Sequence, residues 1–332
     1  MARAAFWRTV EVRKKRGSSV HVTTLPFLRC PQCHQALALH TVVRQLDDEV
    51  LEGSVVCVDG HIYPITDAIP ELLPPDLGAE ELIEREWHNH QASDQGSEIR
   101  VDERSLFSWL TFYQLFELLP HIRRYKPASI LAVMCGTGRE FDIWAKLTPN
   151  VWGADISTGA LVQARQRARG LGITGDMVAV DVGELPFCDQ SFDMVVVHHG
   201  LHHMTSLKEP LLELLRVTRR WCVLCEPVDG AMRRMLRRTG ISPAVEPGGT
   251  KVHDLNEQEV RNLASLGSAR LSKVNRMFFP KPRVTYPTLP YRLGDQLHLP
   301  GLLSVSMRLF NGMFGRWVGT KGTFLLEKKI TQ

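Results

Sequence analysis

Histidines gather in this sequence at a spacing that suits proton transfer. Four of them fall within six positions, at His198, His199, His202 and His203. The pKa of an unperturbed imidazole lies near neutral pH, which makes histidine the usual general base. Such a base can take a proton from a hydroxyl or an amine that lies beside it. The run therefore predicts an acid–base function.

A second group, near the amino terminus, has the side chains and spacing of a metal site: Cys30, Cys33, Cys57 and His61. Two turns that each supply two such ligands can close one tetrahedral Zn²⁺ site, and a Cys3His set leaves no open position. We therefore expect the zinc to be structural. His34 is the competing fourth ligand, but it directly follows Cys33 and is poorly placed. Ordinary cysteines without a metal are the alternative.

Residues 129–146, SILAVMCGTGREFDIWAK, contain elements that would position a ligand. The apolar run 130–134 predicts a buried parallel strand. The turn Cys135-Gly136-Thr137-Gly138 ends this strand, and a helical pattern begins at Phe141. Glycines let a backbone approach a ligand closely, and the N–H groups of a helix start face it. Strand, turn and helix together predict a cofactor cradle.

Strands and helices continue to alternate beyond this turn. Strands are predicted at 150–156, 177–180, 192–197 and 221–225, and helices at 158–169 and 207–219. Ser157 can cap the first helix through its hydroxyl. The alternation predicts an α/β fold with a doubly wound parallel sheet, whose ligands bind at the carboxyl ends of the strands.

Two acids at predicted strand ends indicate the kind of cofactor. Asp155 stands where a carboxylate would meet the ribose hydroxyls of a nucleoside, and Asp181 where one would meet an adenine amine. A dinucleotide-binding fold also has an acid about 20 residues after its glycines, so Asp155 alone does not discriminate. However, Phe141 replaces the third glycine of that motif. The loop also lacks the lysine that a triphosphate site needs.

Taken in order, these motifs resemble the class I S-adenosylmethionine-dependent methyltransferases. The resemblance rests on the glycine turn, LPFCDQSFDMV at 185–195, LHH at 201–203 and Arg216-Val217 before the fifth strand. It spans about residues 128–230 and implies a Rossmann-like, doubly wound, seven-stranded sheet with an antiparallel seventh strand. Segments 269–279 and 320–328 are the candidates for its final hairpin.

The resemblance also implies S-adenosyl-L-methionine as the cofactor and assigns contacts by position. These are Met134, Cys135, Gly136 and Gly138 for the methionine portion, Asp155 and Ile156 for the ribose, Asp181 and Val182 for the adenine, and His198 for the methyl end. His198 and His199 are the candidate catalytic residues, one of them as base or acceptor-orienting group. His202 and His203 belong to the family phrase and are expected to be structural. A histidine metal site is an alternative, but it lacks an obvious carboxylate partner.

Two positions depart from the family pattern. Ala132 stands where the family strand usually carries an acid, and Met134 where it carries a glycine. Arg139, Glu140 or Tyr113 are candidates to take over their roles. A non-catalytic copy of the fold is the alternative.

The cysteine-rich stretch resembles the zinc ribbon at the head of some methyltransferases, over about residues 25–75. Ribosomal-RNA guanine methyltransferases have a second turn of the Cys57-x3-His61 kind, and tRNA-methyltransferase activator proteins have a tail similar to YPITDAIPELLP at 63–74. Between the turns, 42–58 alternates enough to predict a β-hairpin. Because so small a domain has little core, bound zinc would contribute much of its folding free energy.

The remaining boundaries follow from composition. We expect a basic tail over 1–20, the ribbon over 21–75, a helical linker or lid over 76–127, and the methyltransferase domain over 128–332. Within that domain, 232–238 predicts a basic helix, and an insertion at about 281–319 ends in the apolar stretch 302–317. For this stretch, packing against the core is favoured over contact with a membrane surface.

Composition sets broad limits on function. The 332 residues carry a net charge of +4 and seven cysteines. The amino terminus lacks the apolar core of a signal peptide and no run reaches the length of a membrane span, so a cytoplasmic protein is expected. The sequence favours methyl transfer to a small, apolar or aromatic metabolite. Methylation of an RNA base of the guanine type is the alternative, and a non-catalytic partner protein is a third.

Overall fold

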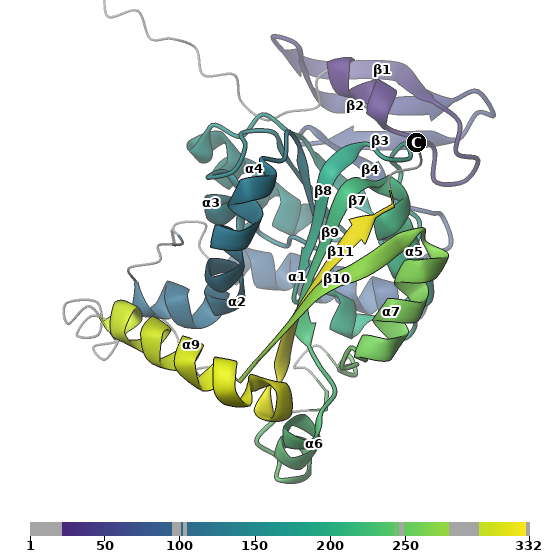
Figure 1. The fold of residues 1–332 in the computed structure, drawn as a ribbon. Helices are drawn as coiled ribbons and strands as arrows, with labels where there is room; N and C mark the ends of the chain where they lie inside the picture. The colour runs from purple at the N-terminus through teal and green to yellow at the C-terminus, as the bar shows by residue number, and fades with distance from the viewer. Residues whose placement is uncertain are drawn as a thin grey trace, which may run out of the picture.

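The computed structural model describes residues 22–94, 101, 105–242, 244–245, 249–278 and 299–329. The basic tail of residues 1–20 and the first part of the predicted insertion, 281–298, lie outside these residues. The described strands form one mixed sheet of eleven, in the order β1-β2-β3-β4-β7-β6-β5-β8-β9-β11-β10 (Figure 1).

Seven of these strands form the sheet that the sequence predicted. The parallel ones are β5 (Ile130–Val133), β6 (Val151–Asp155), β7 (Met177–Val180), β8 (Phe192–His198) and β9 (Thr218–Pro227). β11 (Lys321–Lys328) runs antiparallel to β9, and β10 (Ala269–Met277) antiparallel to β11. The chain order reverses at β5, which lies between β6 and β8. A reversal of this kind leaves a crevice at the carboxyl ends of the strands.

The ribbon, predicted over 21–75, continues this sheet through its last strand. It consists of η1 (Val22–Phe27), β1 (Leu37–Leu46), β2 (Glu49–Cys57), β3 (Ile62–Thr66) and β4 (Ile69–Leu72). The predicted hairpin is β1 and β2, and β4 pairs in parallel with β7 through Leu72 and Val180. The physical reason is that β7 would otherwise be an edge strand with unpaired backbone groups.

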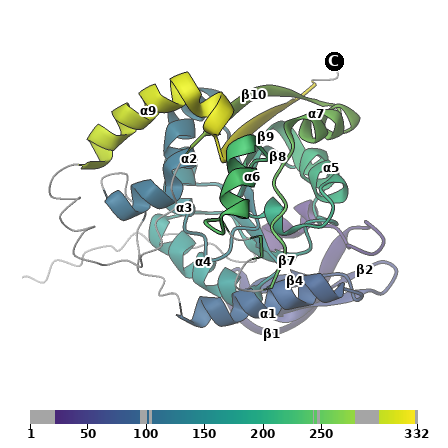
Figure 2. The same cartoon turned by 90° about the horizontal axis from the view of Figure 1, so that it is seen from below.

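Helices cover both faces of the sheet (Figure 2). One face carries α2 (Leu106–Ile122), the single turn α3 (Phe141–Trp144) and α4 (Thr158–Leu171), and the other carries α5 (Lys208–Val217) and α7 (Glu257–Leu266). Side chains of β5 alternate between the two cores, since Leu131 and Val133 face one and Ile130 and Ala132 the other. The short helices η2 (Arg123–Tyr125) and η3 (Leu201–His203) complete this region.

Helix boundaries follow local side-chain chemistry. α4 begins at Thr158 as predicted, because Ser157 Oγ accepts a hydrogen bond from Ala160 N at 3.0 Å. α5 ends two residues before the predicted limit of 219, because Thr218 already pairs with Phe192 as the first residue of β9. Thr218 Oγ1 donates to Leu214 O at 2.6 Å and ends the helix there.

Three further helices, α1 (Ala79–Asp94), α6 (Ala231–Arg238) and α9 (Leu299–Val318), lie toward the carboxyl ends of the parallel strands. α1 and α2 make up most of the segment predicted as a linker or lid. Asn89 of α1 accepts hydrogen bonds from Ser157 Oγ at 2.7 Å and Gly159 N at 3.0 Å, which ties α1 to the start of α4. None of the described helices combines the length and the apolarity that crossing a bilayer requires.

Candidate active site and metal centre

Two cavities adjoin at the carboxyl ends of the central strands. The first has an empty volume of about 740 Å³ and is lined by Asp155, Ile156, Asp181 and Val182 among others. The second has about 1270 Å³ and is lined by Phe107, Phe112, Cys135 and His198 among others. Met134, Gly136, His88 and His199 line both. The cavities therefore meet where β5 and β8 end.

Asp155 is held in place at the wall of the first cavity. Its Oδ2 accepts from Gly136 N at 2.7 Å and its Oδ1 from Ser157 N at 2.9 Å. Burial raises the pKa of Asp181, and the N–H of Gly183, 3.0 Å from Asp181 Oδ1, opposes this shift. The two carboxylates predicted at strand ends thus line one cavity.

The residues of the glycine turn differ in what they contact. Gly136 has a φ of +51°, and a Cβ there would meet nothing within 4 Å, so the backbone is open to the cavities. At Gly138 a Cβ would lie 2.6 Å from the ring of Phe141. Gly138 is needed for this packing and lines neither cavity. Burial raises the pKa of Cys135, which keeps it a neutral thiol on the wall of the second cavity.

Two residues that border both cavities have left-handed backbones. The φ angles of Met134 and His199 are +56° and +59°. This conformation costs a non-glycine residue roughly 1–2 kcal/mol, and where it occurs outside a simple turn it often marks a functional site. The side chain of Met134 lies over Gly200, since a Cβ on Gly200 would be 2.7 Å from Met134 Sδ.

His199, which lines both cavities, has two polar partners. Its Nε2 lies 3.0 Å from Gln114 Oε1 and 3.1 Å from Lys321 Nζ. Gln114 Nε2 donates to Gly322 O at 3.0 Å, which turns Oε1 toward the histidine. Gln114 Oε1 can accept a hydrogen bond from a protonated Nε2, and the ammonium group of Lys321 can donate a hydrogen bond to an unprotonated Nε2. Nε2 of His199 therefore has a partner in either protonation state.

The other three histidines of the run differ in their surroundings. His198 stacks on Phe112, with ring centroids 5.5 Å apart. His202 Nδ1 lies 2.7 Å from Glu226 Oε2, and His203 Nδ1 lies 3.3 Å from Glu84 Oε1.

Glu226 is the carboxylate that the sequence reading did not connect with the histidines. Potential ligand atoms of His199, His202 and Glu226 lie within 4.8 Å of one another. However, Glu226 is fully buried, and its Oε1 accepts from Gly200 N and Leu201 N at 2.8 Å each. Its other oxygen faces His202, so this carboxylate anchors the loop after β8.

Charged residues that sequence reasoning missed line both cavities. Glu80, Glu81 and Glu84 of α1 make the first cavity acidic, and Lys321 adds a cation to the second. Burial would raise the pKa of Glu84, but hydrogen bonds from His203, His88 and Thr250 hold this pKa below its usual range. For α1 the sequence showed only a polar stretch, which did not indicate a cavity wall. No sequence pattern indicated that Lys321 would line a cavity.

Arg139 and Glu140 follow the glycine turn and line the second cavity. Burial lowers the pKa of Arg139, whose guanidinium lies 5.8 Å from the centre of the Phe107 ring. Burial raises the pKa of Glu140 to about 8, and the nearby Asp155 adds to this shift. Glu140 thus places a carboxyl group in this cavity, although Ala132 of β5 stands where the family resemblance implies an acid.

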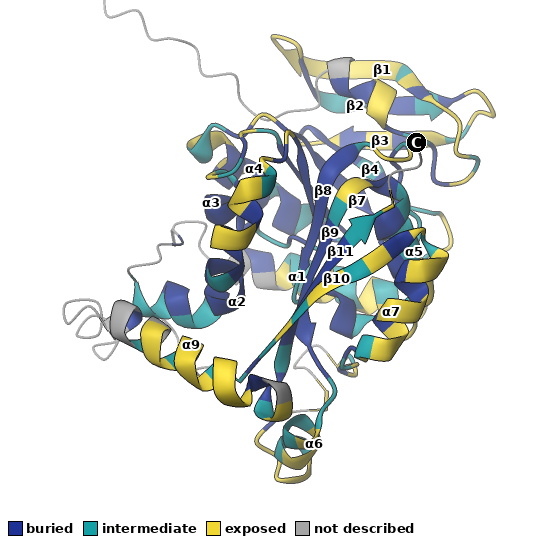
Figure 3. Cartoon of the chain, viewed as in Figure 1, coloured by how far each residue is buried: buried dark blue, intermediate teal, exposed yellow. Residues whose placement is uncertain are grey.

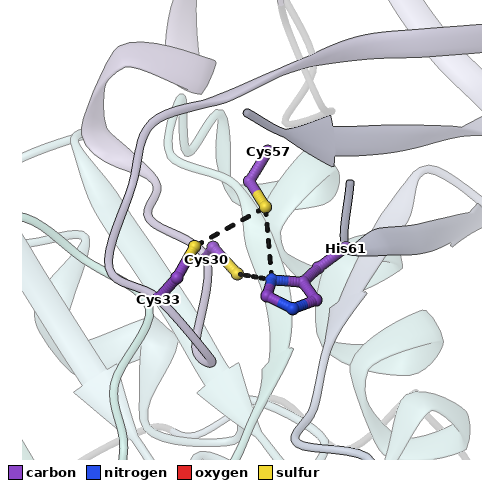
Figure 4. Close-up of side chains that lie close together, drawn as sticks. All are labelled: Cys30, Cys33, Cys57 and His61. Carbon is purple, nitrogen blue, oxygen red and sulfur yellow. Dashed lines mark hydrogen bonds between the residues drawn. The ribbon is translucent and has the colours of Figure 1, made fainter. Parts of the chain in front are cut away.

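Cys30, Cys33, Cys57 and His61 converge in the ribbon (Figure 4). His61 Nδ1 lies 3.5 Å from Cys30 Sγ and 3.3 Å from Cys57 Sγ, and the sulfurs of Cys33 and Cys57 are 3.6 Å apart. Ligands around tetrahedral zinc are separated by about 3.3–3.8 Å, so this donor set fits zinc. His34 lies outside the cluster, exposed and 3.8 Å from Glu184.

Two protein-family models match the chain. Residues 131–224 match the model described as "Methyltransferase domain", and residues 21–67 match "Trm112p-like protein". Both resemblances inferred from the motifs are thereby confirmed: a class I S-adenosylmethionine-dependent methyltransferase domain and a zinc-ribbon-like amino-terminal region.

Several curated relatives match part of the same domain. A demethylmenaquinone methyltransferase of Renibacterium salmoninarum is 36% identical over 90 residues, which are 27% of this chain and 36% of that protein. The ubiquinone/menaquinone biosynthesis C-methyltransferase UbiE of Burkholderia cenocepacia is 36% identical over 94 residues, 27% of this chain and 39% of the relative. The chain thus spans less than half the length of these relatives.

Solved structures share the fold. The magnesium protoporphyrin IX methyltransferase of Synechocystis, with bound SAH, has a TM-score of 0.51 at 14% identity and covers 75% of this chain and 100% of its own. The [4+2]-cyclase SpnF has a TM-score of 0.50 at 15% identity and covers 77% and 98%. Because one of the two is a cyclase, these likenesses establish the fold and leave the reaction to the site.

Proposed function

We propose that this chain transfers a methyl group from S-adenosylmethionine to a small aromatic or otherwise apolar acceptor that carries an ionisable hydroxyl. The observation that carries the proposal is the junction of two cavities at Met134, Gly136 and His199. One cavity has the features of a nucleoside site, and the other has apolar walls with cationic groups. The relatives named for ubiquinone and menaquinone methylation support an acceptor of this class.

The first cavity suits the adenosine portion of the cofactor. Asp155 would accept hydrogen bonds from the ribose hydroxyls, and Asp181 and Val182 would bound the adenine. The acids of α1 provide a negative wall for a cationic sulfonium. The open backbone at Gly136 allows close approach at the junction.

Arg139 and Glu140 are our candidates for the methionine end. A guanidinium suits a carboxylate. Glu140 holds a proton at neutral pH in the free chain, because burial raises its pKa to about 8, and it would ionise when the ammonium group of the cofactor pairs with it. Glu140 would thereby replace the acid that the family carries at the position of Ala132. Tyr113, the third candidate, lies instead beside Asn311 of α9, 3.5 Å from its Nδ2, and burial raises its pKa to about 12.

The second cavity suits the acceptor. When bound, the cofactor supplies an electrophilic methyl group. Nε2 of His199 would take the proton of the acceptor hydroxyl, and Gln114 Oε1 would then accept the hydrogen bond from the protonated nitrogen. Lys321 would stabilise the negative charge on the acceptor oxygen. His198, held against Phe112, would help to position the acceptor.

We also propose that the ribbon binds one structural Zn²⁺ through Cys30, Cys33, Cys57 and His61. The distances between their ligand atoms support this assignment. The match of the ribbon to the Trm112p-like model supports a second candidate function, methylation of an RNA base. An RNA-binding chain should bind total RNA with a steep dependence on salt, since it would neutralise phosphates.

The test combines binding and turnover. We expect SAH to bind in calorimetry, Asp155→Ala to weaken this binding at least about tenfold, and His34→Ala, whose side chain is exposed and lines neither cavity, to leave it unchanged. Methyl transfer should be assayed with naphthohydroquinone and with total RNA. His199→Ala should lower kcat for the hydroquinone by about 10²-fold or more with little change in SAH affinity. Absence of SAH binding would refute the proposal and favour a non-catalytic partner protein.

A further inference from the structure

Helix α9 carries two apolar faces, of which the described part of the chain buries one. On the inner face Leu303 and Met307 pack against the core beneath α2. Asn311 Oδ1 accepts from Phe278 N at 2.9 Å, and Arg308 pairs with Glu117 at 2.7 Å. These contacts hold α9 on α2 and the end of β10. The packing that the sequence favoured is therefore present on this face.

The outer face presents a row of large apolar side chains. Val305, Leu309, Met313 and Trp317 are spaced four residues apart and are 59%, 64%, 64% and 70% exposed. Side chains at this spacing lie on one side of a helix. Phe310 and Phe314 flank the row at 37% and 42% exposure, and Figure 3 shows the exposed face along the helix. A contiguous apolar patch of this kind marks an interaction site.

The neighbouring helix α6 is basic. It contacts α9, and both lie at the end of the molecule opposite the ribbon (Figures 1 and 2). The sequences of the two helices contain no acid and six arginines: Arg233, Arg234, Arg237, Arg238, Arg308 and Arg316. Asp254 pairs with Arg233 and Arg237, and Asp229 with Arg234. Two acids thus offset only part of the charge of α6.

We propose that the outer face of α9 and the arginines of α6, together the α6/α9 surface, bind an anionic lipid bilayer. The apolar row ends in a tryptophan, and the exposed arginines Arg234 and Arg238 lie on the neighbouring helix α6. Apolar, aromatic and basic side chains together are typical of surfaces that lie in the membrane interface. Anionic headgroups attract arginines that lie close to the surface. A nucleic acid would use the arginines but leave the apolar row exposed to water, so lipid fits both halves of this surface.

The α6/α9 surface lies beside the second cavity. β9 leads into α6, and α9 leads into β11, whose first residue Lys321 pairs with Pro227 and lines that cavity. Bilayer contact would therefore bring the cavity close to an acceptor dissolved in lipid. This consequence rests on the proposed function, whereas lipid binding itself does not.

The test is co-sedimentation of the full chain with two kinds of vesicle, phosphatidylcholine alone and equal parts phosphatidylcholine and phosphatidylglycerol, without cofactor. We expect at least about tenfold tighter binding to the mixed vesicles, weakened by salt. The double variant Leu309→Glu, Met313→Glu should reduce this binding at least about tenfold, because it places charges on the apolar row. Arg238→Glu should reduce the preference for mixed vesicles.

Val43→Glu is the matched control, because Val43 is 75% exposed on β1 in the ribbon. It should bind vesicles as the unmodified chain does. Each variant is also tested for SAH affinity and thermal unfolding, so a folding defect is recognised, and loss of SAH binding alone would affect only the proposed function. The inference is overturned if the chain binds neither vesicle, if the double variant binds normally, or if the chain forms a dimer through α9 in place of binding lipid. It is also overturned if the chain binds vesicles only after residues 279–298 are removed.

Discussion

Met134 has a backbone conformation that normally belongs to glycine. Its φ of +56° is left-handed, and its side chain lies against Gly200 where the two cavities meet. The family resemblance implies a glycine at this position, so a methionine in its place adds both the backbone strain and the bulk of a side chain. The site therefore either uses the methionine side chain or tolerates the free-energy cost of its left-handed backbone.

We expect Met134→Gly to bind SAH several-fold more tightly than the unmodified chain. Relief of about 1 kcal/mol of strain should offset the lost packing of a half-buried side chain, so the free energy of unfolding should change by less than about 1 kcal/mol. Met134→Ala removes the bulk but keeps the strain, and should therefore be less stable than the glycine variant. Calorimetry with SAH and urea unfolding measure both effects. Weaker SAH binding by Met134→Gly would mean that the methionine side chain contributes to the cofactor site.

Glu140 should make stability depend on pH. Its pKa is raised from 4.5 to about 8 by burial, so between these values the folded state holds a proton that the unfolded state has lost. Stability from this group is therefore fully present below about pH 4.5 and decreases as pH rises toward 8. Urea unfolding from pH 5 to pH 9 should show a shallower decrease for Glu140→Gln than for the unmodified chain. Parallel curves would show that Glu140 does not hold this proton.

At the scale of elements, the proposed zinc site of the ribbon has His61 as its fourth ligand. We expect His61→Ala to lose bound zinc and His34→Ala to retain one equivalent, because His61 lies within the cluster and His34 outside it. A structural zinc contributes a large part of the folding free energy of a small domain, so His61→Ala should also lower the midpoint of thermal unfolding. Metal analysis and calorimetry measure the two effects. Equal zinc content in the two variants would refute the assignment.

The strands of the parallel sheet could be predicted because each is a short apolar run bounded by turns. This pattern located β7 at Met177–Val180 without error, and the final hairpin came from the family resemblance. The pairing of β4 with β7 could not be predicted, since the tail of the ribbon does not specify which sheet edge it joins. The end of α5 was missed because Val217 and Thr218 suit a helix end and a strand start equally.

The same distinction applies to the candidate site: its residues at strand ends could be predicted, and those brought in by packing could not. Asp155, Asp181 and His198 stand at strand ends, and parallel strands bring such residues to one edge of the sheet, so their convergence could be predicted. Gln114 and Lys321 reach His199 from helix α2 and the last strand, 85 and 122 residues away in sequence. No local pattern connects residues so far apart. Only the packing of α2 and β11 against β8 and β9 brings them together.

At the scale of the whole molecule, ribbon and methyltransferase domain share one sheet and one core. Leu28, Tyr63 and Leu72 of the ribbon belong to the same apolar cluster as Val180 and Phe187. Arg29 N donates to Pro186 O at 2.9 Å, and Cys188 N donates to Phe27 O at 3.0 Å. Glu49 of β2 pairs with Arg165 and Arg169 of α4. Contacts of backbone, core and charge thus join the two parts.

Because these contacts join the ribbon to the methyltransferase domain, zinc bound in the ribbon should stabilise the entire chain. Loss of the ribbon would expose the edge of β7 and the apolar side chains that Leu28 and Leu72 cover, so the two parts should unfold in one cooperative transition. We expect zinc release, followed with a chromophoric chelator, to coincide in urea with the change in tryptophan fluorescence. Trp152 of β6 is a suitable reporter, because its ring lies 6.2 Å from that of Phe27 in the ribbon. Zinc released at clearly lower urea, with SAH binding intact, would show that the ribbon folds and unfolds independently.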